Sequence, residues 1–558
     1  MSTVITDRLR ELIAAALERA AADGVVSFER QPTIALERPK RREHGDWSSN
    51  VALALGDRER SPRAVAEALS ERLPSSDVVA RVEVAGPGFL NFHLAPAWLH
   101  DVVRRAADPG SDFARTDGGA RAKVGRVNVE YVSANPTGPA NVVSGRHAAY
   151  GDAVANLLEA TGHDVTREYY VNDAGRQMEL FARSVEARYL QSFGVPAELP
   201  EDGYRGDYIT DLAKDIANDV GDELVHAEED RRLAELRVLA LERTLESIRA
   251  SLERFGTRYD VWFSEASLHA RGAVGDAVER LRTEGWLEER DGAQWFLTSR
   301  LGDDKDRVIV RADGTPTYLA ADAAYMLDKF ERGFERLIYV LGSGHHGTLP
   351  RFRAIADALG FGRERLEFPL VQNVTIVREG LALQASKRAG VIVPLDELVD
   401  EVGADPVRYT FLTRSLDAPL EFDVDAVKDK APDNPVYYTQ YAHARISSIL
   451  RRAEGEGIAP VREGAPLDAL RHPSEDALMR KLASFEEVVP DAARARAPQK
   501  ITRYGEELAS DFSAFYRDGR VIGDDAGLTR ARLELCVATK RVLADSLRLL
   551  GIGAPEEM

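Results

Sequence analysis

The chain has 558 residues, with 73 Lys and Arg against 92 Asp and Glu, so its formal net charge is −19 at pH 7. With 44% hydrophobic and 30% charged residues it has the composition of a globular protein of about two to four domains. Its single cysteine excludes an intrachain disulfide and a cysteine-based zinc cluster, and we expect a cytoplasmic protein with no signal peptide and no membrane span.

Residues 1–118 predict a small α/β module that is separate from the rest of the chain. Apolar residues recur at helical spacing over 6–21 and 63–73. Short strands are expected at 80–85 and 89–94, joined by a turn rich in glycine and proline. A polar, glycine-rich stretch then ends the module.

Strands and helices alternate over residues 119–425, which predicts a parallel sheet with crossover helices. The expected strands are 126–132, 164–171, 337–341 and 369–377. Residues 173–191 and 208–255 are helix-rich and predict an insertion between the two halves of the sheet. The fold class of this region is therefore α/β.

The most informative loop is Asn135-Pro136-Thr137-Gly138-Pro139, which follows strand 126–132 and precedes a helix expected from about 145 to 160. A loop that turns from a strand onto a helix N-terminus presents free N–H groups and the positive end of the helix dipole. Such a turn can hold phosphates. Many α/β proteins have a similar turn that binds nothing, so the pattern alone leaves both interpretations open.

Two further loops contain or are bracketed by glycines. Gly342-Ser343-Gly344-His345-His346-Gly347 follows strand 337–341, again as a glycine-rich strand-to-helix turn. The adjacent histidines have no third ligand nearby in the sequence, so we expect no metal site. Ser386 and Lys387 lie on a loop bracketed by Gly380 and Gly390, which suits a moving element.

Beyond residue 426 the pattern becomes helical, with apolar residues three and four apart, and predicts a helix bundle over 426–558. The expected helices are 435–453, 474–488, 500–518 and 526–550. Basic residues are enriched here and over 38–42. They could be solvated helix faces or a localised footprint for nucleic acid, which the net negative charge does not exclude.

Four segments together resemble a known family. The run 129–147 resembles the HIGH-motif region of class I aminoacyl-tRNA synthetases, in the Asn-Pro-Thr-Gly-Pro form typical of bacterial arginyl-tRNA synthetases. Segments 43–50 and 85–92 resemble the arginyl-specific N-terminal domain, and 434–445 resembles the start of the anticodon-binding bundle. The resemblance implies a tRNA-contacting module at 1–118, a Rossmann-like catalytic domain with a helical insertion at 119–425, and a helical anticodon-binding domain at 426–558.

Both signature motifs are degenerate. The positions of His-x-Gly-His hold Asn141, Val142, Val143 and Ser144, and the KMSK motif reads Gln384-Ala385-Ser386-Lys387. The chain is therefore either a working arginine–tRNA ligase or a catalytically altered paralogue that binds tRNA or ATP without charging tRNA. A scaffold protein is a third alternative. Because the other parts of the machinery are retained, we favour the enzyme.

The resemblance implies L-arginine, arginine tRNA and ATP with Mg²⁺ as substrates, no tightly bound cofactor, and a monomer. A guanidinium substrate requires carboxylates, for which the resemblance offers Glu130 and Asp322, with Asn135 at the α-amino group and Tyr318 closing the pocket. The predicted catalytic residues are Lys387, Ser144 and His147, the last two as replacements for the missing histidines. The predicted ATP-binding residues are Ala134, Asn135, Pro136, Thr137, Gly138, Pro139, Asn141, Ser144, Gly342, His345, His346, Ser386 and Lys387.

Overall fold

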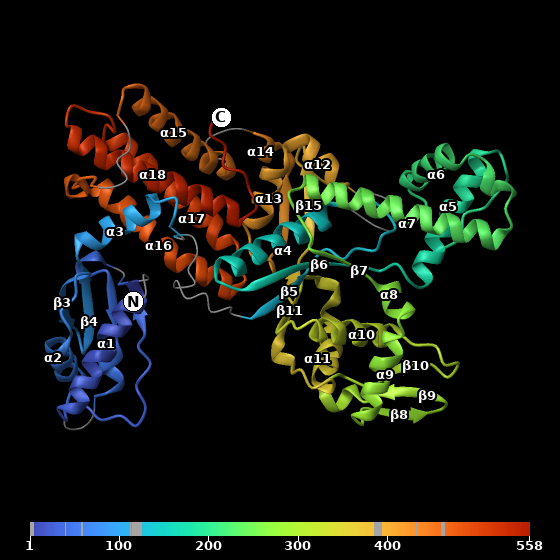
Figure 1. The fold of residues 1–558 in the computed structure, drawn as a ribbon, viewed down its shortest axis with the longest axis horizontal. Coiled ribbons are helices and arrows are strands. Elements are labelled where there is room, and N and C mark those ends of the chain that lie inside the picture. The colour runs from blue at the N-terminus through green and yellow to red at the C-terminus, as the bar shows by residue number, and fades with distance from the viewer. Residues whose placement is uncertain are drawn as a thin grey trace.

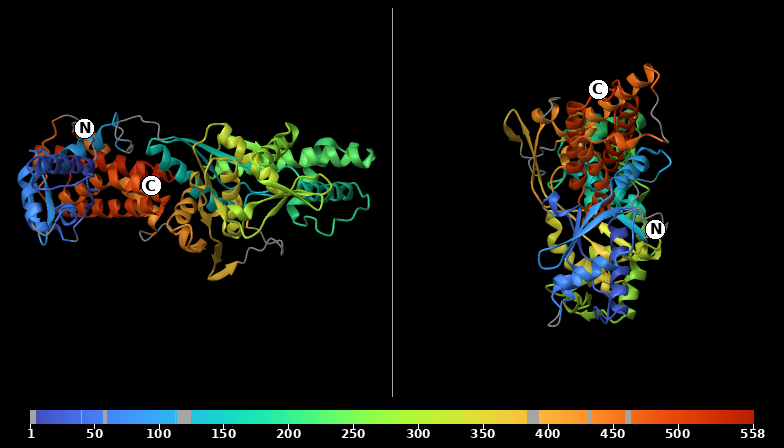
Figure 2. Two further views of the ribbon diagram at one scale, coloured as in Figure 1. Left: turned by 90° about the horizontal axis from the view of Figure 1, so that it is seen from below. Right: turned by 90° about the vertical axis from the view of Figure 1, so that its left-hand side faces the viewer.

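The computed structural model describes residues 5–39, 41–56, 60–111, 113, 125–383, 393–429, 434–458 and 464–558. The molecule is elongated (Figures 1 and 2). An amino-terminal α/β module lies at one end, a helix bundle lies beside a central α/β domain, and a helical insertion projects from the other end. Of the described helices, none is both long and apolar enough to cross a membrane.

The amino-terminal module is a four-stranded antiparallel sheet covered by helices. The strand order is β1 (Leu36–Glu37), β2 (Trp47–Ser49), β4 (Phe89–Leu94) and β3 (Val79–Ala85). Its helices are α1 (Ile5–Ala22) and α2 (Pro62–Arg72), and α3 (Pro96–Ala107) leaves the module to pack on the bundle. Ser61 caps α2 by accepting a hydrogen bond from the Ala64 N–H at 3.3 Å.

Segment 43–50, which resembles a signature of the arginyl-specific N-terminal domain, helps to join the module to the bundle. Asp46 pairs with Arg480 of the bundle. Arg38 donates to Glu487 at 2.8 Å, and its guanidinium lies 4.6 Å from the Trp47 ring. Arg38, from the basic cluster over 38–42, is therefore committed to a contact between the two parts of the chain.

The central sheet is parallel throughout, in the order β13-β11-β5-β6-β7. Its strands are β5 (Arg126–Glu130), β6 (Asp164–Val171), β7 (Val261–Ser264), β11 (Arg336–Tyr339) and β13 (Leu366–Glu367). From β5 the chain runs outward through β6 and β7, and from β11 it runs the opposite way to β13. The order reverses between β5 and β11, which is where open α/β sheets bind ligands at their carboxyl edge.

Helix α4 (Val142–Ala160) connects β5 to β6 and begins three residues before the predicted start. The side chain of Asn141 explains the difference, because its Oδ1 accepts the Ser144 N–H at 3.0 Å and caps the helix. The helix lies close to the sheet at Gly151, where an added Cβ would lie 2.2 Å from the Tyr131 ring. Only glycine permits this approach.

The single strand predicted over 369–377 is two strands. β14 (Leu370–Val371) pairs with β12 (Leu341–Gly342), whereas β15 (Val374–Arg378) pairs with β16 (Leu381–Leu383) and β17 (Leu420–Asp423). Between them, the carbonyls of Gln372 and Asn373 accept hydrogen bonds from the fully buried Arg146 of α4, at 2.8 and 3.4 Å. The carbonyls that turn toward this guanidinium interrupt the strand.

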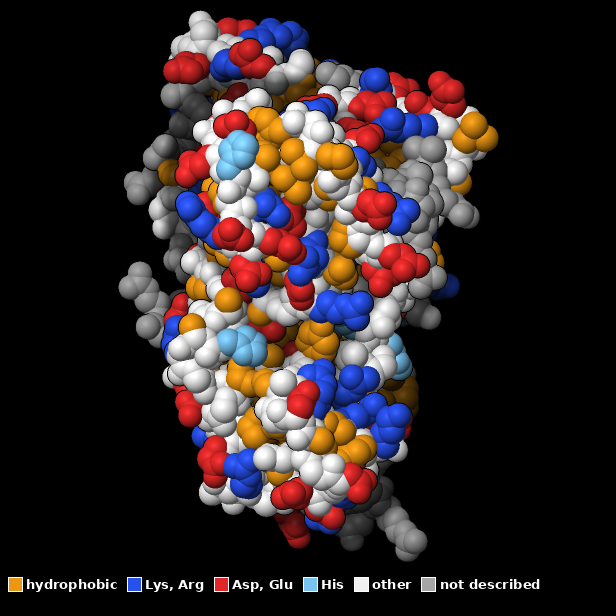
Figure 3. All heavy atoms as spheres, turned by 90° about the vertical axis from the view of Figure 1, so that its right-hand side faces the viewer, with side chains coloured by type: hydrophobic (Ala, Val, Ile, Leu, Met, Phe, Trp, Pro, Cys, Tyr) orange, Lys and Arg blue, Asp and Glu red, His pale blue; other side chains and the backbone are white. Residues whose placement is uncertain are grey.

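Two units interrupt the central sheet. The predicted helical insertion consists of α5 (Arg176–Ser192), α6 (Asp207–Val220) and α7 (Glu229–Arg254) around a core of its own. The second unit was not predicted from the sequence. It contains helices α8 (Glu265–Ala270) and α9 (Ala273–Thr283) and the antiparallel strands β8 (Leu287–Arg290), β9 (Ala293–Phe296) and β10 (Arg307–Val310). The sequence feature that could have revealed it is Asp291-Gly292, a dipeptide typical of hairpin turns, which joins β8 to β9 with positive φ at both residues. Seen from this end, acidic and basic side chains are interspersed on the surface (Figure 3).

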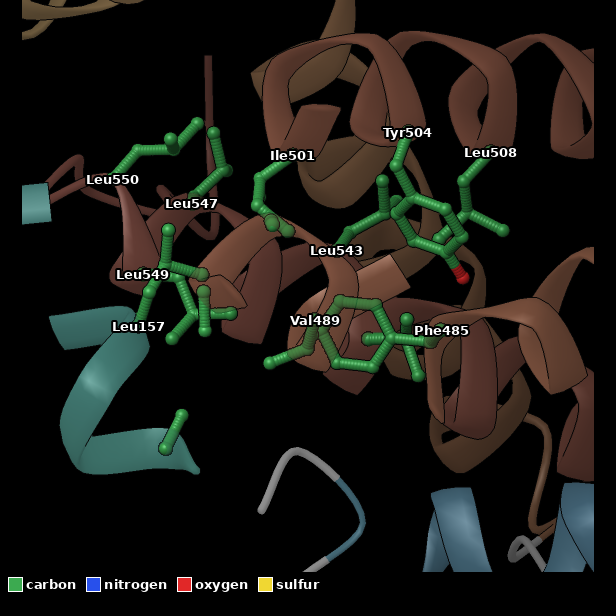
Figure 4. Close-up of a cluster of buried hydrophobic side chains, with 14 of the residues drawn as sticks. Leu157, Phe485, Val489, Ile501, Tyr504, Leu508, Leu543, Leu547, Leu549 and Leu550 are labelled. Atoms are coloured by element: carbon green, nitrogen blue, oxygen red, sulfur yellow. The ribbon is translucent and has the colours of Figure 1, made fainter. Parts of the chain in front are cut away.

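The remaining helices of the central domain flank the sheet. They are α10 (Tyr318–Glu331), α11 (Leu349–Ala358), α12 (Leu395–Val402), α13 (Ala404–Leu412) and α14 (Val424–Lys428). The bundle contains the four predicted helices as α15 (Pro435–Gly455), α16 (Pro473–Ala495), α17 (Gln499–Asp518) and α18 (Ala526–Leu549). Helix α16 continues past its predicted end at 488 and includes Pro490. Leu157 of α4 packs into the same apolar cluster as Phe485 and Leu547 of the bundle (Figure 4).

A buried arginine links the central domain to the end of the bundle. Arg408 on α13 is fully buried and pairs with Asp152 of α4 at 2.5 Å. It also donates to Thr257 Oγ1 at 2.9 Å and to the carbonyl of Leu550, just beyond α18, at 3.2 Å. A buried guanidinium requires such acceptors, so these segments are held together at one point.

Candidate functional site

A cavity of about 610 Å³ lies where the strand order reverses, at the carboxyl ends of β5 and β11. It brings together the predicted residues Glu130, Ala134, Asn135, Asn141, Ser144, His147, Tyr318, Asp322, Gly342 and His345. The carboxylates come from β5 and α10, whereas the capping and imidazole side chains come from the first turns of α4. Segments that are distant in the sequence therefore meet at one site.

The other predicted residues have different positions. Thr137, Gly138 and Pro139 line a smaller adjoining cavity of about 230 Å³. Pro136 is buried and His346 is exposed, and neither lines either of these two cavities. Ser386 and Lys387 lie outside the described residues, but Val393, where the description resumes after them, lines the larger cavity.

The turn that follows β5 has a strained backbone. Val132 and Ser133 have φ of 67° and 39°, which is uncommon for residues other than glycine and costly for a β-branched side chain. Neighbouring groups hold the turn in place: the Tyr170 N–H donates to Ser133 Oγ at 3.0 Å, and the Tyr169 hydroxyl donates to the Ala134 carbonyl at 2.8 Å. Strain that is maintained in this way is typical of binding sites.

The amino-terminal end of α4 faces the cavity. Asn141 Oδ1 accepts the Ser144 N–H at 3.0 Å and the Ser144 hydroxyl at 3.3 Å. Asn141, at the first position of the degenerate motif, therefore caps the helix, and the hydroxyl of Ser144, at the last position, bonds to the capping oxygen. The positive end of the helix dipole is directed at the cavity, where an anion would be stabilised.

His147 turns its ring toward the loop after β11. A Cβ added to Gly342 would lie 4.0 Å from His147 Nε2, and the side chain lines the cavity. Burial lowers the pKa of His147 to about 4. A hydrogen bond to the backbone of Val340 raises this pKa slightly, and the nearby charges of His345 and Arg146 lower it further. The imidazole is therefore neutral at pH 7 and can donate one N–H.

Glu130 lines the cavity and belongs to a network of four charged residues that we call the floor: Glu130 and, behind it, Lys329, Glu168 and Arg332. Lys329 is fully buried, and its Nζ lies 2.5 Å from Glu130 Oε2 and 4.0 Å from Glu168 Oε1. Arg332 donates to both Glu168 oxygens, at 2.7 and 2.9 Å. Burial raises the pKa of Glu168, but Lys329 and Arg332 bring it below its ordinary value. Glu130 thus lines the cavity with its charge already matched.

The opposite wall, formed by Tyr318, Asp322 and Arg351, differs from the floor. No described side chain donates a hydrogen bond to Asp322, and its pKa is raised to about 7 by burial and by the carboxylates of Glu265 and Glu130, with Arg351 opposing them. Tyr318 begins α10 one turn before Asp322 and is 65% exposed, so it can cover a ligand bound there. Arg351 lies on this wall but makes no described hydrogen bond or ion pair with Asp322, so a bound cation can still pair with this carboxylate.

Glu265, the first residue of α8, was not predicted from the sequence. Its pKa is raised by burial, and its carboxylate accepts a hydrogen bond from Tyr170, which lines the cavity. The available signal was Ser264, a helix cap at the carboxyl end of β7 immediately before the acid. Glu265 and Asp322 together make this side of the cavity acidic.

Within the described residues, no three His, Cys, Asp or Glu side chains are grouped so as to hold a metal ion. The side chains on the α4 side of the cavity are amide, hydroxyl and imidazole groups, which suit an oxygen-rich anion.

A third hollow, of about 830 Å³, lies between α15 and α17 in the bundle. Its lining includes Arg451, Arg452, Arg517 and Arg520. Arg445 lies 4.5 Å from the Tyr516 ring and donates to the Tyr441 hydroxyl at 3.1 Å. Exposed tyrosine rings beside arginines are typical of surfaces that bind single-stranded nucleic acid.

Models of known families match most of the chain. Residues 7–94 match the arginyl tRNA synthetase N terminal domain, 115–409 match the class I (R) tRNA synthetase catalytic domain, and 439–558 match the DALR anticodon binding domain. The three matches fall largely within the module, the central domain and the bundle, in that order.

Full-length relatives are also similar. The arginine–tRNA ligase of Carboxydothermus hydrogenoformans is 46% identical over 557 residues, covering 99% of this chain and 100% of the relative. The enzyme of the same name from Moorella thermoacetica is 46% identical over 563 residues, covering 100% of both. The solved structure of Thermus thermophilus arginyl-tRNA synthetase has a TM-score of 0.76 at 24% identity, covers 99% of this chain and 100% of that one, and supports the fold.

Proposed function

The chain belongs to the arginyl-tRNA synthetase family, and we propose that it activates L-arginine with ATP and transfers it to arginine tRNA in the cavity between β5, α4 and α10. The observation that carries the proposal is the wall at Asp322, a carboxylate without a described donor in a cavity that also holds a helix N-terminus. A cation and a phosphate-bearing ligand are thereby accommodated side by side. No observation favours the altered paralogue.

The arginine side chain is assigned to the wall. A guanidinium is planar and can donate two parallel N–H bonds to one carboxylate, and Asp322 is available for it. Glu265 adds negative charge from behind Tyr170, and Tyr318 closes the pocket. Glu130 is assigned to the same guanidinium from the floor, where its ion pair with Lys329 fixes its position. Asn135 is assigned to the α-amino group of arginine.

ATP is assigned to the other half of the cavity. The α4 terminus with Asn141, Ser144 and His147 faces the loop that holds Gly342 and His345. The arginine carboxylate attacks the α-phosphorus, and pyrophosphate leaves. A neutral His147 can donate its N–H to a phosphate oxygen as charge develops there. Lys387, predicted from its motif, is assigned to the pyrophosphate.

Mg²⁺ is proposed to enter with the nucleotide. This ion prefers phosphate oxygens and water to a dedicated protein cage, and the amide, hydroxyl and imidazole groups on the α4 side fit that arrangement. When bound, the ion would neutralise charge on the departing pyrophosphate. The chain's own contribution is to position the two reactants.

The bundle is assigned to the anticodon loop. The hollow lined by Tyr441, Arg445 and Tyr516 offers rings on which unpaired bases can stack and cations for their phosphates. The arginines around this hollow concentrate positive charge in one place on a chain whose net charge is −19. We further propose a monomer located in the cytoplasm, where its tRNA substrate is, and light scattering tests the monomer.

The direct test is aminoacylation with purified protein. We expect charging of arginine tRNA with ATP and Mg²⁺, and ATP–pyrophosphate exchange that depends on arginine, measured with and without tRNA. Lysine in place of arginine is the matched control for the guanidinium site. Folded protein that charges no arginine tRNA would exclude the proposal.

A further inference from the structure

A cation lies on the same wall of the main cavity as Asp322. Arg351 stands in the first turn of α11 and lines the cavity of about 610 Å³ together with Asp322 and Tyr318. Its side chain is half-buried. The wall therefore presents both a negative and a positive side chain to the occupant of the cavity.

Arg351 has no partner among the described residues. Its Nε is buried and finds no hydrogen-bond acceptor there, and none of the described carboxylates forms an ion pair with its guanidinium. Other buried arginines differ, because Arg146 donates to four carbonyls through its terminal nitrogens and Arg408 pairs with Asp152. A buried guanidinium edge without an acceptor is costly, so we expect an anion to complete it.

The fold fixes the backbone that carries Arg351. The next residue on α11, Phe352, packs its ring 5.5 Å from that of Tyr339 on β11. Before the helix, the Thr348 hydroxyl donates to the His345 carbonyl at 2.7 Å and closes the turn that leads into α11. The side chain of Arg351 therefore starts from a point on the wall that is anchored on both sides.

The charges of Arg351 and Asp322 influence one another without a described bond between them. Burial raises the pKa of Asp322, the carboxylates of Glu265 and Glu130 raise it further, and Arg351 opposes them. A ligand with only a positive charge would gain contact with Asp322 and would be repelled by Arg351. A ligand that also carries a carboxylate would satisfy both groups.

The position of Arg351 favours a carboxylate over a phosphate as its partner. Ser144 and His147, which are assigned to ATP, belong to the first turns of α4. The charge of Arg351 acts on Asp322, whereas the charges that act on His147 are those of His345 and Arg146. Arg351 thus belongs to the half of the cavity that is assigned to the amino acid, and the anion that L-arginine carries into this half is its own α-carboxylate.

We propose that Arg351 is a specificity residue of this pocket, which pairs with the α-carboxylate of L-arginine and excludes cations that lack a carboxylate, such as agmatine and polyamines. The inference rests on the proposed function and deepens it, because it defines the substrate class as a guanidinium that also carries a carboxylate. No covalent bond is made or broken at Arg351. One carboxylate oxygen bonds to its guanidinium, and the other stays free to attack the α-phosphorus.

The test compares ligands that share the guanidinium and differ at the carboxylate. Calorimetry measures the binding of L-arginine, L-argininamide and agmatine to the full-length wild type and to Arg351→Met, which retains an apolar side chain and removes the charge. The wild type should bind L-arginine about tenfold or more tightly than the other two, as expected for a charge-assisted hydrogen bond. Arg351→Met should lose this preference for L-arginine and should bind agmatine at least as tightly as the wild type does.

Control variants separate this effect from others. Arg353→Met removes an exposed arginine of the same helix, outside the cavity lining, and should bind all three ligands like the wild type. Asp322→Asn should weaken all three alike, because they share the guanidinium. Arg351→Lys retains the charge and should recover part of the preference for L-arginine. If Arg351→Met does not fold, as judged by its melting temperature, Arg351→Gln takes its place and should behave as predicted for the methionine variant.

Three results would overturn the role of Arg351. Unchanged affinities, or equal losses for all three ligands, would show that Arg351 does not contact the carboxylate. Tighter binding of all three by the same factor would make Arg351 a repelling charge and nothing more. A rise confined to the KM for ATP in pyrophosphate exchange would assign Arg351 to the nucleotide. A folded wild type that binds none of the three ligands would instead reject the proposed function, so the two failures are distinguishable.

Discussion

The floor of the main cavity contains buried carboxylates and the wall a half-buried one, and their surroundings differ. On the floor, Glu130 is matched by Lys329 at 2.5 Å, and Glu168 is matched by Arg332. On the wall, Asp322 has no described donor, and burial raises its pKa to about 7. A cavity-lining carboxylate left unpaired by the folded chain is better evidence for a ligand than a buried charge that is already paired. The floor is built for stability and the wall for binding.

The largest effect is expected on the floor, from Lys329→Met. Removing the ammonium leaves Glu130 buried and unpaired, which should destabilise the protein by about 3–5 kcal/mol. The measurement is the thermal or urea midpoint of the purified variant. A double variant, Lys329→Met with Glu130→Gln, should recover part of the loss, because it removes both charges. A single variant that melts with the wild type would show that the floor does not depend on this pair.

The next effect is expected on the wall, from Asp322→Asn. Losing this carboxylate should cost about 2–5 kcal/mol of arginine binding, seen as a raised KM for arginine with little change in that for ATP. Unaltered arginine kinetics would place the guanidinium elsewhere. Glu130→Gln should lower the melting temperature, because it leaves the buried ammonium of Lys329 unpaired, and it should raise the KM for arginine less than Asp322→Asn does.

Asp322→Asn should also change stability in the opposite direction to Lys329→Met. Because the folded pKa of Asp322 is raised to about 7, the native state binds this proton more tightly than the unfolded chain, whose pKa is about 4. The native carboxyl therefore costs stability progressively as pH rises from about 4 to 7, and the full cost is present above that. The variant should melt above the wild type at pH 8, and the difference should vanish near pH 4. Equal melting temperatures at pH 8 would contradict this prediction.

The contrast between floor and wall could not be read from the sequence. Motif resemblance identified Glu130 and Asp322 as equivalent guanidinium ligands, because both stand at matching positions. The partner of Glu130 is Lys329, which lies 199 positions along the chain and reads as a surface charge on a helix. Only the packing of α10 against β5 brings the two together in the core.

Local patterns predicted the fold more successfully than they predicted the partners of buried charges. Helical periodicity gave the four bundle helices, and alternation predicted a parallel sheet, because both depend on spacing within a segment. The split of the strand over 369–377 depends on Arg146, a residue of a different helix whose guanidinium binds the carbonyls there. The roles of Lys387 and Ser386 stay predictions, since both lie outside the described residues.

A smaller effect is expected from His147→Ala on the phosphate side. If the neutral ring donates to developing charge, the rate of adenylation should fall about tenfold. ATP–pyrophosphate exchange measures it, and a variant that exchanges at the normal rate would exclude the ring from the reaction.

The pH dependence of stability tests the environment of His147 separately. Its folded pKa of about 4 lies below the ordinary 6.5, so the unfolded chain binds this proton more tightly. The wild type should therefore lose stability as pH falls from about 6.5 to 4, and His147→Ala should lose less over that range. Parallel melting curves for the two proteins would show that the ring is not buried in solution.

The smallest effect is expected far from both floor and wall, in the hollow of the bundle. Arg445→Ala should raise the KM for tRNA several-fold and weaken its dependence on salt, because one cation near the phosphates is lost. The KM values for arginine and ATP should not change. Arg494→Ala removes an exposed arginine outside the hollow and serves as the control. Equal effects of the two substitutions on tRNA would remove the hollow from the proposal.

The contact between Arg408 and the carbonyl of Leu550 has a consequence for how the protein is made. Translation completes the α/β domain long before Leu550 leaves the ribosome, so a buried guanidinium in that domain lacks one of its acceptors until the last helix has emerged. The catalytic half therefore reaches its final packing only when the bundle has docked. A premature stop a few codons before Leu550 would leave its defect beside α4, near the centre of the enzyme.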